Sequence, residues 1–208
     1  MDTDKPKSAI YPLFATPLMH SGEQYKINVN ELEYIKSLKT RSPYNKENKR
    51  TESSDVLESF ELSTLKQFCL KWISFYAHEF LTITKSTEFY ITQSWCNFAS
   101  KGDMHKAHMH SNSLISGVFY IQGKNTPLVF HREKDMFALK FNYDKWDMNN
   151  CEAYVMEMEA GKLFLFPSSL KHSVFENDTD TERISLSFNT FASGEFGVEQ
   201  NSNWLKLS

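Results

Sequence analysis

Residues 161–172 have the sequence Gly161-Lys-Leu-Phe-Leu-Phe-Pro167-Ser-Ser-Leu-Lys-His172. The glycine is typical of a turn, the apolar run of a buried strand, and the proline of the end of that strand. A single histidine then stands where the next strand is expected to begin. The segment therefore predicts a β-sheet protein in which the start of a strand presents a polar side chain.

The second half of the chain shows the same strand pattern, because the hydrophobic period changes from near four to two after about Phe89. Short runs rich in Phe, Val, Ile and Tyr are separated by polar clusters, which is typical of an antiparallel sandwich or barrel. We expect strands over residues 89–98, 114–121, 128–130, 153–158, 162–166, 173–175 and 184–191.

Residues 1–88 predict a mainly helical region that braces one sheet. Asn30 and Glu33 are spaced as an N-cap and its reciprocal acid, and an amphipathic stripe of apolar residues accompanies them. Residues 64–67 repeat this capping pattern at the start of a longer helix. The apolar residues of that helix recur at i, i+3 and i+4 spacing: Leu65, Phe68, Cys69, Trp72 and Tyr76.

Two further segments carry structural expectations. Residues 41–55 are almost wholly polar and contain Pro43, so we expect a mobile surface loop there, either simply solvated or acting as a lid. Trp204 and Leu205 are candidates to dock the C-terminus.

The composition favours one globular domain over residues 1–208, with a helical support region (1–88) and a β-sheet core (89–192). A net charge of −3 gives no field that would gather nucleic acid or anionic lipid. Cys69, Cys96 and Cys151 are too widely spaced for a disulfide framework or a thiolate zinc site. The N-terminal residues are polar and no long apolar run follows, so we expect no signal peptide, no membrane span and a cytoplasmic protein.

Three of the seven histidines, His105, His108 and His110, lie within six residues. Residues two apart on an extended chain point to the same side, so His108 and His110 can present two imidazoles to one ion. His172 can add a third donor from a distant strand that faces them across the mouth of a barrel. The alternatives are a polar hairpin with exposed histidines and, for His172, a packed side chain.

Arg183 opens a strand in which the polar residues Ser185, Ser187 and Asn189 alternate with apolar ones, so one face of that strand is expected to be wet. A guanidinium in a barrel mouth is costly unless it meets an anion, and its planar fork matches a carboxylate. Arg183 with Ser185 therefore predicts a receptor for a small dicarboxylate. The alternative is a surface arginine paired with a neighbouring acidic side chain.

These residues resemble the signature of the 2-oxoglutarate and Fe(II)-dependent oxygenases. The run Asn97-Phe-Ala99-Ser-Lys-Gly102-Asp-Met-His-Lys-Ala-His108-Met-His110 resembles N-x-Y-x-x-G-x-x-x-x-x-H-x-D in register, and His172 and Arg183-Ile-Ser185 resemble the distal His and the R-x-S motif. Three runs, 108–120, 166–177 and 182–189, look like a little-characterised branch of that superfamily found in bacteria and phages.

The resemblance implies a double-stranded β-helix, or jelly roll, that binds Fe(II) and 2-oxoglutarate at one mouth. It implies a set of metal ligands that are also the catalytic residues: His108, His110 and His172. By the same resemblance, Arg183 and Ser185 hold the distal carboxylate of 2-oxoglutarate and Asn97 approaches the iron-side end of this cosubstrate. Tyr120 is a further candidate for the carboxylate.

Two positions depart from the family pattern. His110 stands where the family has Asp, and Ala99 stands where it has Tyr. An Fe(II) ion with three neutral imidazoles keeps its full charge, which should alter affinity and the energetics of oxidation. Alternatively, His110 lies outside the ligand set and Asp103 or His105 is the third ligand.

The activity implied is that of a hydroxylase-type dioxygenase that converts 2-oxoglutarate to succinate and CO2 and acts on a small molecule or a protein side chain.

A competing hypothesis comes from two runs, Gly102-x5-His108-x-His110 and Gly161-x5-Pro167-x4-His172, which resemble the halves of the cupin motif. A cupin-like metalloprotein, either a dioxygenase or an isomerase, would not use 2-oxoglutarate. The third hypothesis is a non-enzymatic jelly-roll binding module with vestigial histidines. No basic and aromatic stripe indicates nucleic acid.

Overall fold

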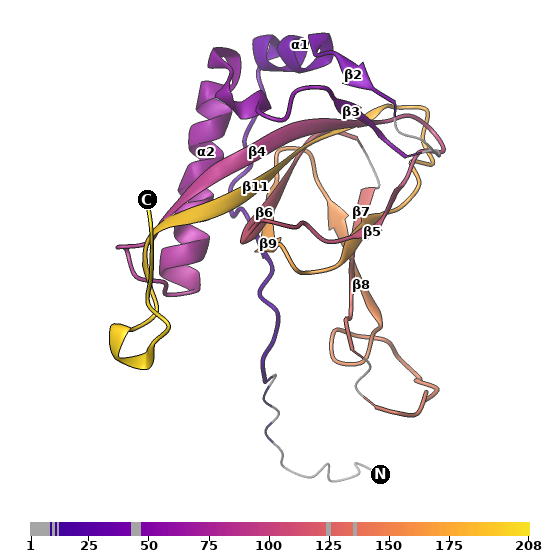
Figure 1. The fold of residues 1–208 in the computed structure, drawn as a ribbon. Coiled ribbons are helices and arrows are strands. Elements are labelled where there is room, and N and C mark those ends of the chain that lie inside the picture. Colours follow the sequence, from indigo (N-terminus) through magenta and orange to yellow (C-terminus); the bar gives the residue numbers. More distant parts are fainter. Residues whose placement is uncertain (1–8, 10, 12, 43–46, 124–125, 135–136) are drawn as a thin grey trace.

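Two antiparallel sheets form the framework of the protein in a computed structural model, which describes residues 9, 11, 13–42, 47–123, 126–134 and 137–208 (Figure 1). In spatial order, the larger sheet consists of β1 (Met19–His20), β9 (Leu163–Pro167), β6 (Ile115–Gln122), β11 (Arg183–Phe196), β4 (Glu88–Ala99), β3 (Lys49–Thr51) and β2 (Thr40–Arg41), with β12 (Leu205–Leu207) paired to β11. The smaller sheet consists of β5 (His105–His108), β10 (His172–Val174), β7 (Thr126–His131) and β8 (Ala153–Met158).

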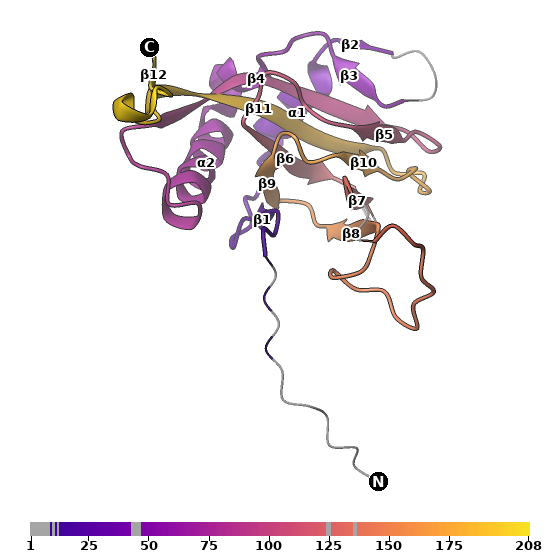
Figure 2. The ribbon, with the colours of Figure 1, turned by 60° about the horizontal axis from the view of Figure 1, so that its bottom comes forward.

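Helices cover one face of the larger sheet, and the smaller sheet lies toward the other face (Figures 1 and 2). The helical elements are α1 (Val29–Ser37), α2 (Ser63–Ser74), a π-helical turn η3 (Phe75–Phe80) that continues α2, and the short 3-10 turns η1 (Val56–Glu58), η2 (Phe60–Leu62) and η4 (Glu199–Asn201). This is the mainly β, α+β arrangement that the strand pattern and the helical first half predict.

The strand predictions are confirmed for every long strand. The expected strands at 89–98, 114–121, 128–130, 153–158, 162–166, 173–175 and 184–191 correspond to β4, β6, β7, β8, β9, β10 and β11. The missed strands, β1, β2, β3, β5 and β12, have two to four residues each, so little alternation shows in the sequence, although β10, with three residues, was predicted.

Both predicted helices exist, but the predicted caps are wrong. Helix α1 is capped by Asn28, whose side chain accepts from the Glu31 amide while Glu31 accepts from the Asn28 amide, so the capping box lies two residues before Asn30 and Glu33. Helix α2 starts at Ser63 with no side-chain cap, and Thr64 lies inside its first turn. The spacing of a cap and its acid recurs by chance in a polar segment, and tertiary packing decides which copy is used.

The prediction of a mobile loop over 41–55 is wrong for its described part. Residues 40–41 and 49–51 form a β2–β3 hairpin that extends the larger sheet, and Asn48 and Thr51 are buried. Residues 43–46, including Pro43, lie outside the described residues. The Thr51 hydroxyl accepts from the Cys96 amide on β4, which ties the hairpin to the sheet.

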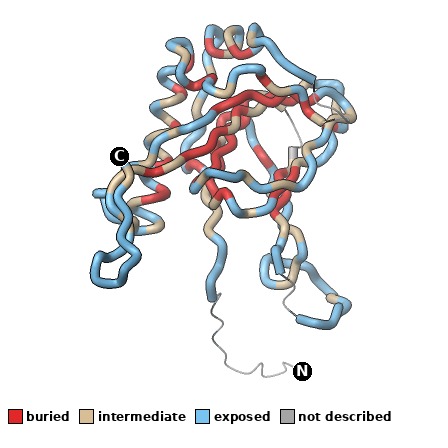
Figure 3. The backbone as a smooth tube through the Cα atoms, viewed as in Figure 1, coloured by how far each residue is buried: buried red, intermediate tan, exposed pale blue. Residues whose placement is uncertain are grey.

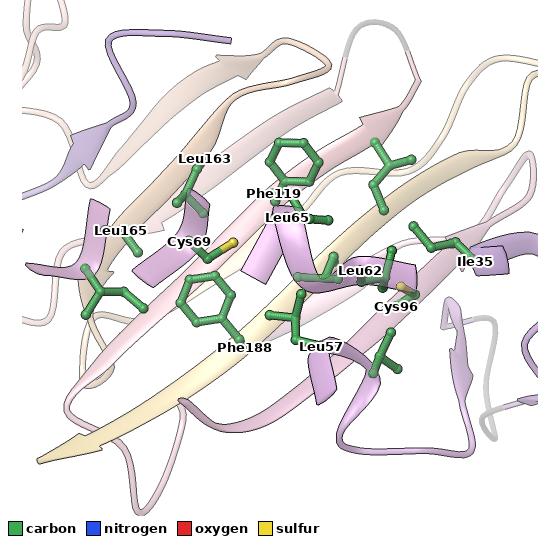
Figure 4. Close-up of a cluster of buried hydrophobic side chains, with 14 of the residues drawn as sticks. Ile35, Leu57, Leu62, Leu65, Cys69, Cys96, Phe119, Leu163, Leu165 and Phe188 are labelled. Atoms are coloured by element: carbon green, nitrogen blue, oxygen red, sulfur yellow. The ribbon is translucent and has the colours of Figure 1, made fainter. Parts of the chain in front are cut away.

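The main core lies between the helices and the larger sheet (Figure 4). Leu65 and Cys69 of α2 pack against Phe119 of β6 and Phe188 of β11, all with no exposed surface. A second, smaller cluster fills the space between the sheets and includes Val118, Phe130 and Phe166. Figure 3 shows that burial follows the central strands, whereas the connection between β7 and β8 is largely exposed.

Strand alternation separates these two environments. On β6 and β11 one set of side chains enters the main core, and the residues between them face the space between the sheets.

At the C-terminus, β12 pairs with β11 while Trp204 and Leu205 stay half exposed, so the end of the chain is held mainly by its backbone. Within the described ranges, no helix is long and apolar enough to span a bilayer.

We expect Gly117→Ala to destabilise the protein by about 1–3 kcal/mol, because the added methyl overpacks a closed core. A Cβ at this position would lie 2.1 Å from the ring of Phe188, a side chain with no exposed surface. Urea denaturation measures the change. Gly22→Ala is the matched control, since its Cβ would meet Trp72 at an ordinary 3.7 Å; equal stability of the two variants would contradict this packing account.

Candidate metal centre

Three histidines meet at one end of the space between the sheets. His108 of β5 and His172 of β10 are directly opposite each other in the antiparallel pairing of these strands. His110 follows β5, and its amide donates to the carbonyl of Ser168 at 3.0 Å. The ligand nitrogens of the three rings all lie within 4.8 Å of one another. The structure thus brings together the three predicted residues, but His172 comes from the neighbouring strand of the same sheet rather than from a strand across the mouth.

Each ring is oriented by a hydrogen bond at Nδ1. The Nδ1–H of His108 donates to the Lys106 carbonyl at 2.8 Å, that of His172 to the Leu170 carbonyl at 2.9 Å, and that of His110 to Asn189 Oδ1 at 2.5 Å. A carbonyl oxygen can only accept, so these bonds place the proton on Nδ1. Neutral rings in this tautomer turn the lone pairs of Nε2 toward the centre of the group.

The spacing of the Nε2 atoms suits a shared metal ion. His108 Nε2 and His110 Nε2 are 3.2 Å apart. Two nitrogens bound at about 2.1 Å and at a right angle would be about 3 Å apart. Two facing lone pairs at that distance repel unless a cation lies between them. Neutral imidazoles are donors that suit Fe, Zn, Cu and Ni.

Burial keeps two of these rings unprotonated. It lowers the pKa of His172 to about 3, and it also lowers the pKa of His110. A metal ion therefore need not displace a proton from these two rings near neutral pH.

Asn189 was recognised in the sequence only as part of a polar strand face, and its role was missed. Its Oδ1 accepts from His110 and, at 3.2 Å, from the hydroxyl of Ser116. Ser116 is hydrogen-bonded in turn to Ser168, which is bonded to Ser113. This chain of hydrogen bonds holds the side-chain amide of Asn189 in place, and Asn189 in turn orients the ring of His110. The signal that could have identified Asn189 is its position on the same alternating face as Ser185.

The centre opens into a cavity lined by all of the other predicted site residues. Ser185 on β11 is in register with Asn97 on β4 and with Tyr120 on β6, so the three side chains form a row across adjacent strands. Apolar side chains complete the wall: Val118, Leu128, Phe166 and Val174. The wet face predicted for β11 is confirmed, since Ser185, Ser187 and Asn189 line this cavity or the adjoining cleft.

Arg183 lines the same cavity and is 4% exposed. Its Nη1 donates to the Phe175 carbonyl at 2.9 Å, whereas its buried Nη2 has no hydrogen-bond partner. Burial lowers the pKa of Arg183, although a guanidinium stays charged in proteins. A buried donor without a partner costs free energy, which an oxyanion bound in the cavity would recover. The alternative of a surface arginine paired with an acidic neighbour is therefore wrong.

The two alternative candidates for the third ligand, His105 and Asp103, are not part of the group of converging nitrogens. His105 stacks on His108 with ring centroids 4.3 Å apart, and it lines the cavity without joining the three converging nitrogens. Asp103 accepts from the Ser100 amide in the turn before β5. Ala99, which stands where the family pattern has Tyr, is in register with Arg183 and is buried. Tyr120 is the phenol in the cavity, and burial raises its pKa.

A wider cleft of about 1150 Å³ adjoins the centre on its outer side. Trp95 of β4 stacks on His110 at a centroid distance of 5.6 Å, and the guanidinium of Arg50 lies 4.3 Å from the centre of the Trp95 ring. The β2–β3 hairpin contributes most of the remaining polar wall: Arg41, Ser42, Glu47 and Asn48. Neither Trp95 nor Arg50 was recognised in the sequence, because contacts between separate strands leave no local pattern.

The two facing sheets and the histidine group define a class of protein, a double-stranded β-helix with a candidate metal centre at one end. Residues 93–189 match the family model described as "Putative 2OG-Fe(II) oxygenase", where 2OG is 2-oxoglutarate, so this part of the chain is similar to that family. The family uses Fe(II) and 2-oxoglutarate. No curated protein sequence matches the chain.

Solved structures of other proteins share the fold. A 2OG-Fe(II) oxygenase family oxidoreductase from Burkholderia pseudomallei has a TM-score of 0.57 at 12% identity, with 83% of each chain covered. HygX from Streptomyces hygroscopicus, with nickel, 2-oxoglutarate and hygromycin B bound, has a TM-score of 0.57 at 11% identity, covering 84% of this chain and 82% of that one. The epimerase SnoN of nogalamycin biosynthesis has a TM-score of 0.58 at 12% identity, covering 86% and 81%. The predicted double-stranded β-helix is thereby confirmed.

We expect Asn189→Ala to weaken the binding of a divalent metal such as Co(II) by about 10–100-fold, because His110 loses the acceptor that orients it. Asn189→Asp keeps an acceptor oxygen at this position and should retain most of the affinity. Competition with a chromogenic chelator measures the dissociation constants. Asn201→Ala, on exposed η4, is the control; an unchanged affinity in Asn189→Ala would refute the orienting role.

Proposed function

We propose that this protein is a non-haem Fe(II) and 2-oxoglutarate-dependent oxygenase that hydroxylates an organic substrate, either a small molecule or a protein side chain. One observation carries the proposal. Three imidazole lone pairs and a buried guanidinium with a free N–H face the same cavity, so one space offers both a metal site and an oxyanion site.

In this proposal His108, His110 and His172 hold the iron. Their Nδ1–H bonds keep the rings in place before the metal arrives, which lowers the cost of ordering the site. Three neutral donors leave the full positive charge of Fe(II) in the site, whereas an Asp at position 110 would cancel part of it. We therefore expect the site to bind an anionic cosubstrate strongly, with 2-oxoglutarate supplying the missing negative charge.

Arg183 and Ser185 hold the distal carboxylate of 2-oxoglutarate. The unpartnered Nη2 of Arg183 donates to this group, and the Ser185 hydroxyl lies on the same inner face. In this proposal Asn97 and Tyr120, which are in register with Ser185, donate to other oxygens of the cosubstrate. The apolar wall that includes Leu128 and Val174 packs on its methylene groups and excludes water.

Bound Fe(II) and 2-oxoglutarate supply the activation of O2, with conversion of the cosubstrate to succinate and CO2. The residues of the chain position the cosubstrate on one side and leave the outer cleft open for the substrate. SnoN is described as an epimerase, so this fold supports more than one outcome on the substrate. Hydroxylation is proposed here as the simplest outcome, in which one oxygen atom is transferred to a C–H bond.

We expect purified protein, reconstituted anaerobically, to bind about one Fe(II) per chain, and His172→Ala to lose this iron. His105→Ala is the matched control, because His105 is an imidazole of the same cavity outside the converging group, and it should keep the metal. Metal analysis measures the ratio. Less than about a tenth of an equivalent of iron in the unaltered protein would instead support a binding module with vestigial histidines.

We expect Fe(II) and 2-oxoglutarate together, without oxygen, to give a visible charge-transfer band, and air to give succinate. Arg183→Gln should raise the dissociation constant of 2-oxoglutarate at least about tenfold, because a charged, buried hydrogen bond is lost. Lys101→Gln, which removes a cation paired with Asp180 on the surface, is the control. A fully active Arg183→Gln variant, with no charge-transfer band, would favour the cupin-like metalloprotein that acts without 2-oxoglutarate.

A further inference from the structure

The outer cleft carries an arrangement of charge that the iron and cosubstrate sites do not use. Arg41 of β2 and Arg50 of β3 are directly opposite each other in the hairpin, and both line the cleft. Like charges in directly opposite positions of a hairpin are destabilising. The hairpin therefore holds two guanidiniums side by side at a cost in stability.

Neither guanidinium is neutralised within the described part of the chain. The ion pairs of the described residues involve other side chains, and the acidic residue of the cleft, Glu47, pairs with Lys106 at 3.4 Å. Burial and the nearby Arg41 both lower the pKa of Arg50, which reflects how poorly its charge is compensated, although the group remains charged. The cleft is thus positive in a protein whose net charge is −3.

The side chain of Arg50 is restrained by contacts with its neighbours. Its guanidinium stacks on Trp95, its Nη2 donates to the Ser54 hydroxyl at 3.4 Å, and its Nε is buried without a partner. Asn48 is 8% exposed and also presents a buried amide oxygen with no partner at the border of the cavity and the cleft. Preorganised polar groups without protein partners are what a binding site for a polar ligand requires.

We propose that the outer cleft binds the organic substrate through an oxyanion group, a carboxylate or a phosphate, held by Arg50 and Arg41. This inference rests on the proposed function, since it assigns the substrate to that site. The guanidinium fork matches both oxyanions. Arg50 stacks on Trp95 and Trp95 stacks on His110, so an anion held by Arg50 would lie about one indole ring away from the candidate metal centre, within reach of an extended substrate.

The test uses acetate and inorganic phosphate as probes on the full chain without added metal, oxygen or 2-oxoglutarate, so its result does not depend on iron chemistry. The indole N–H signal of Trp95 in a proton–nitrogen NMR spectrum, assigned with Trp95→Phe, reports on the ring that Arg50 covers. We expect a saturable shift with acetate, phosphate or both, and none with acetamide, the uncharged analogue of acetate. A stronger response to acetate assigns a carboxylate substrate, and a stronger response to phosphate assigns a phosphate ester.

Substitutions of Arg50, Arg41 and Lys49 test where the acetate or phosphate ion binds. Arg50→Gln should weaken the response about tenfold, and Arg41→Gln, at the exposed end of the pair, should weaken it less. Lys49→Gln removes the same charge one residue away, from an exposed side chain that does not line the cleft, and should leave the response unchanged. The proposal is overturned if neither anion shifts the signal, if acetamide shifts it equally, or if the response survives in both arginine variants, which would place the ion elsewhere, as at Arg183.

Discussion

Hydrogen bonds at the Nδ1 atoms of three rings are the constraint on which this site depends. Each bond ends on an oxygen that can only accept, so each ring keeps its proton on the outer nitrogen and turns a lone pair inward. Two of the three acceptors are backbone carbonyls within two residues of the ring, and these follow from local chain geometry. The third, on Asn189, comes from the other sheet. His110 is therefore the ring whose orientation relies on the sheets being correctly placed relative to each other.

The alternation of strands provides this placement. On β11 the even positions Ile184, Leu186 and Phe188 enter the core beneath the helices, and the odd positions present Arg183, the serines and Asn189 to the cavity. A shift of one residue in the pairing of β11 would bury the polar set among the helices and expose the apolar set. The core and the site thus stabilise the same register, and neither can be changed without affecting the other.

Much of this was visible in the sequence. The period-two segments located β4, β6 and β11, and the spacing of His108 and His110 showed that the two rings share a side. Most of the short strands were not predicted, because two to four residues carry little alternation. The cap of α1 was misplaced because Asn28 and Asn30 have the same acid spacing. Asn189, Trp95 and Arg50 were missed for a different reason. Their roles arise from contacts across strands, and no pattern along one strand records what lies opposite it.

The β2–β3 hairpin is at the edge of the larger sheet, whereas the three histidine rings belong to β5, β10 and the segment after β5. The two regions meet at the Trp95 ring, at the Glu47–Lys106 ion pair and at a β-bridge between Glu47 and Met104, but their strands belong to different sheets. In the proposed function, substitutions in the hairpin can therefore alter substrate recognition while the three histidines of the candidate metal centre stay unchanged. An edge hairpin of this kind would let specificity vary separately from the residues proposed to hold the iron.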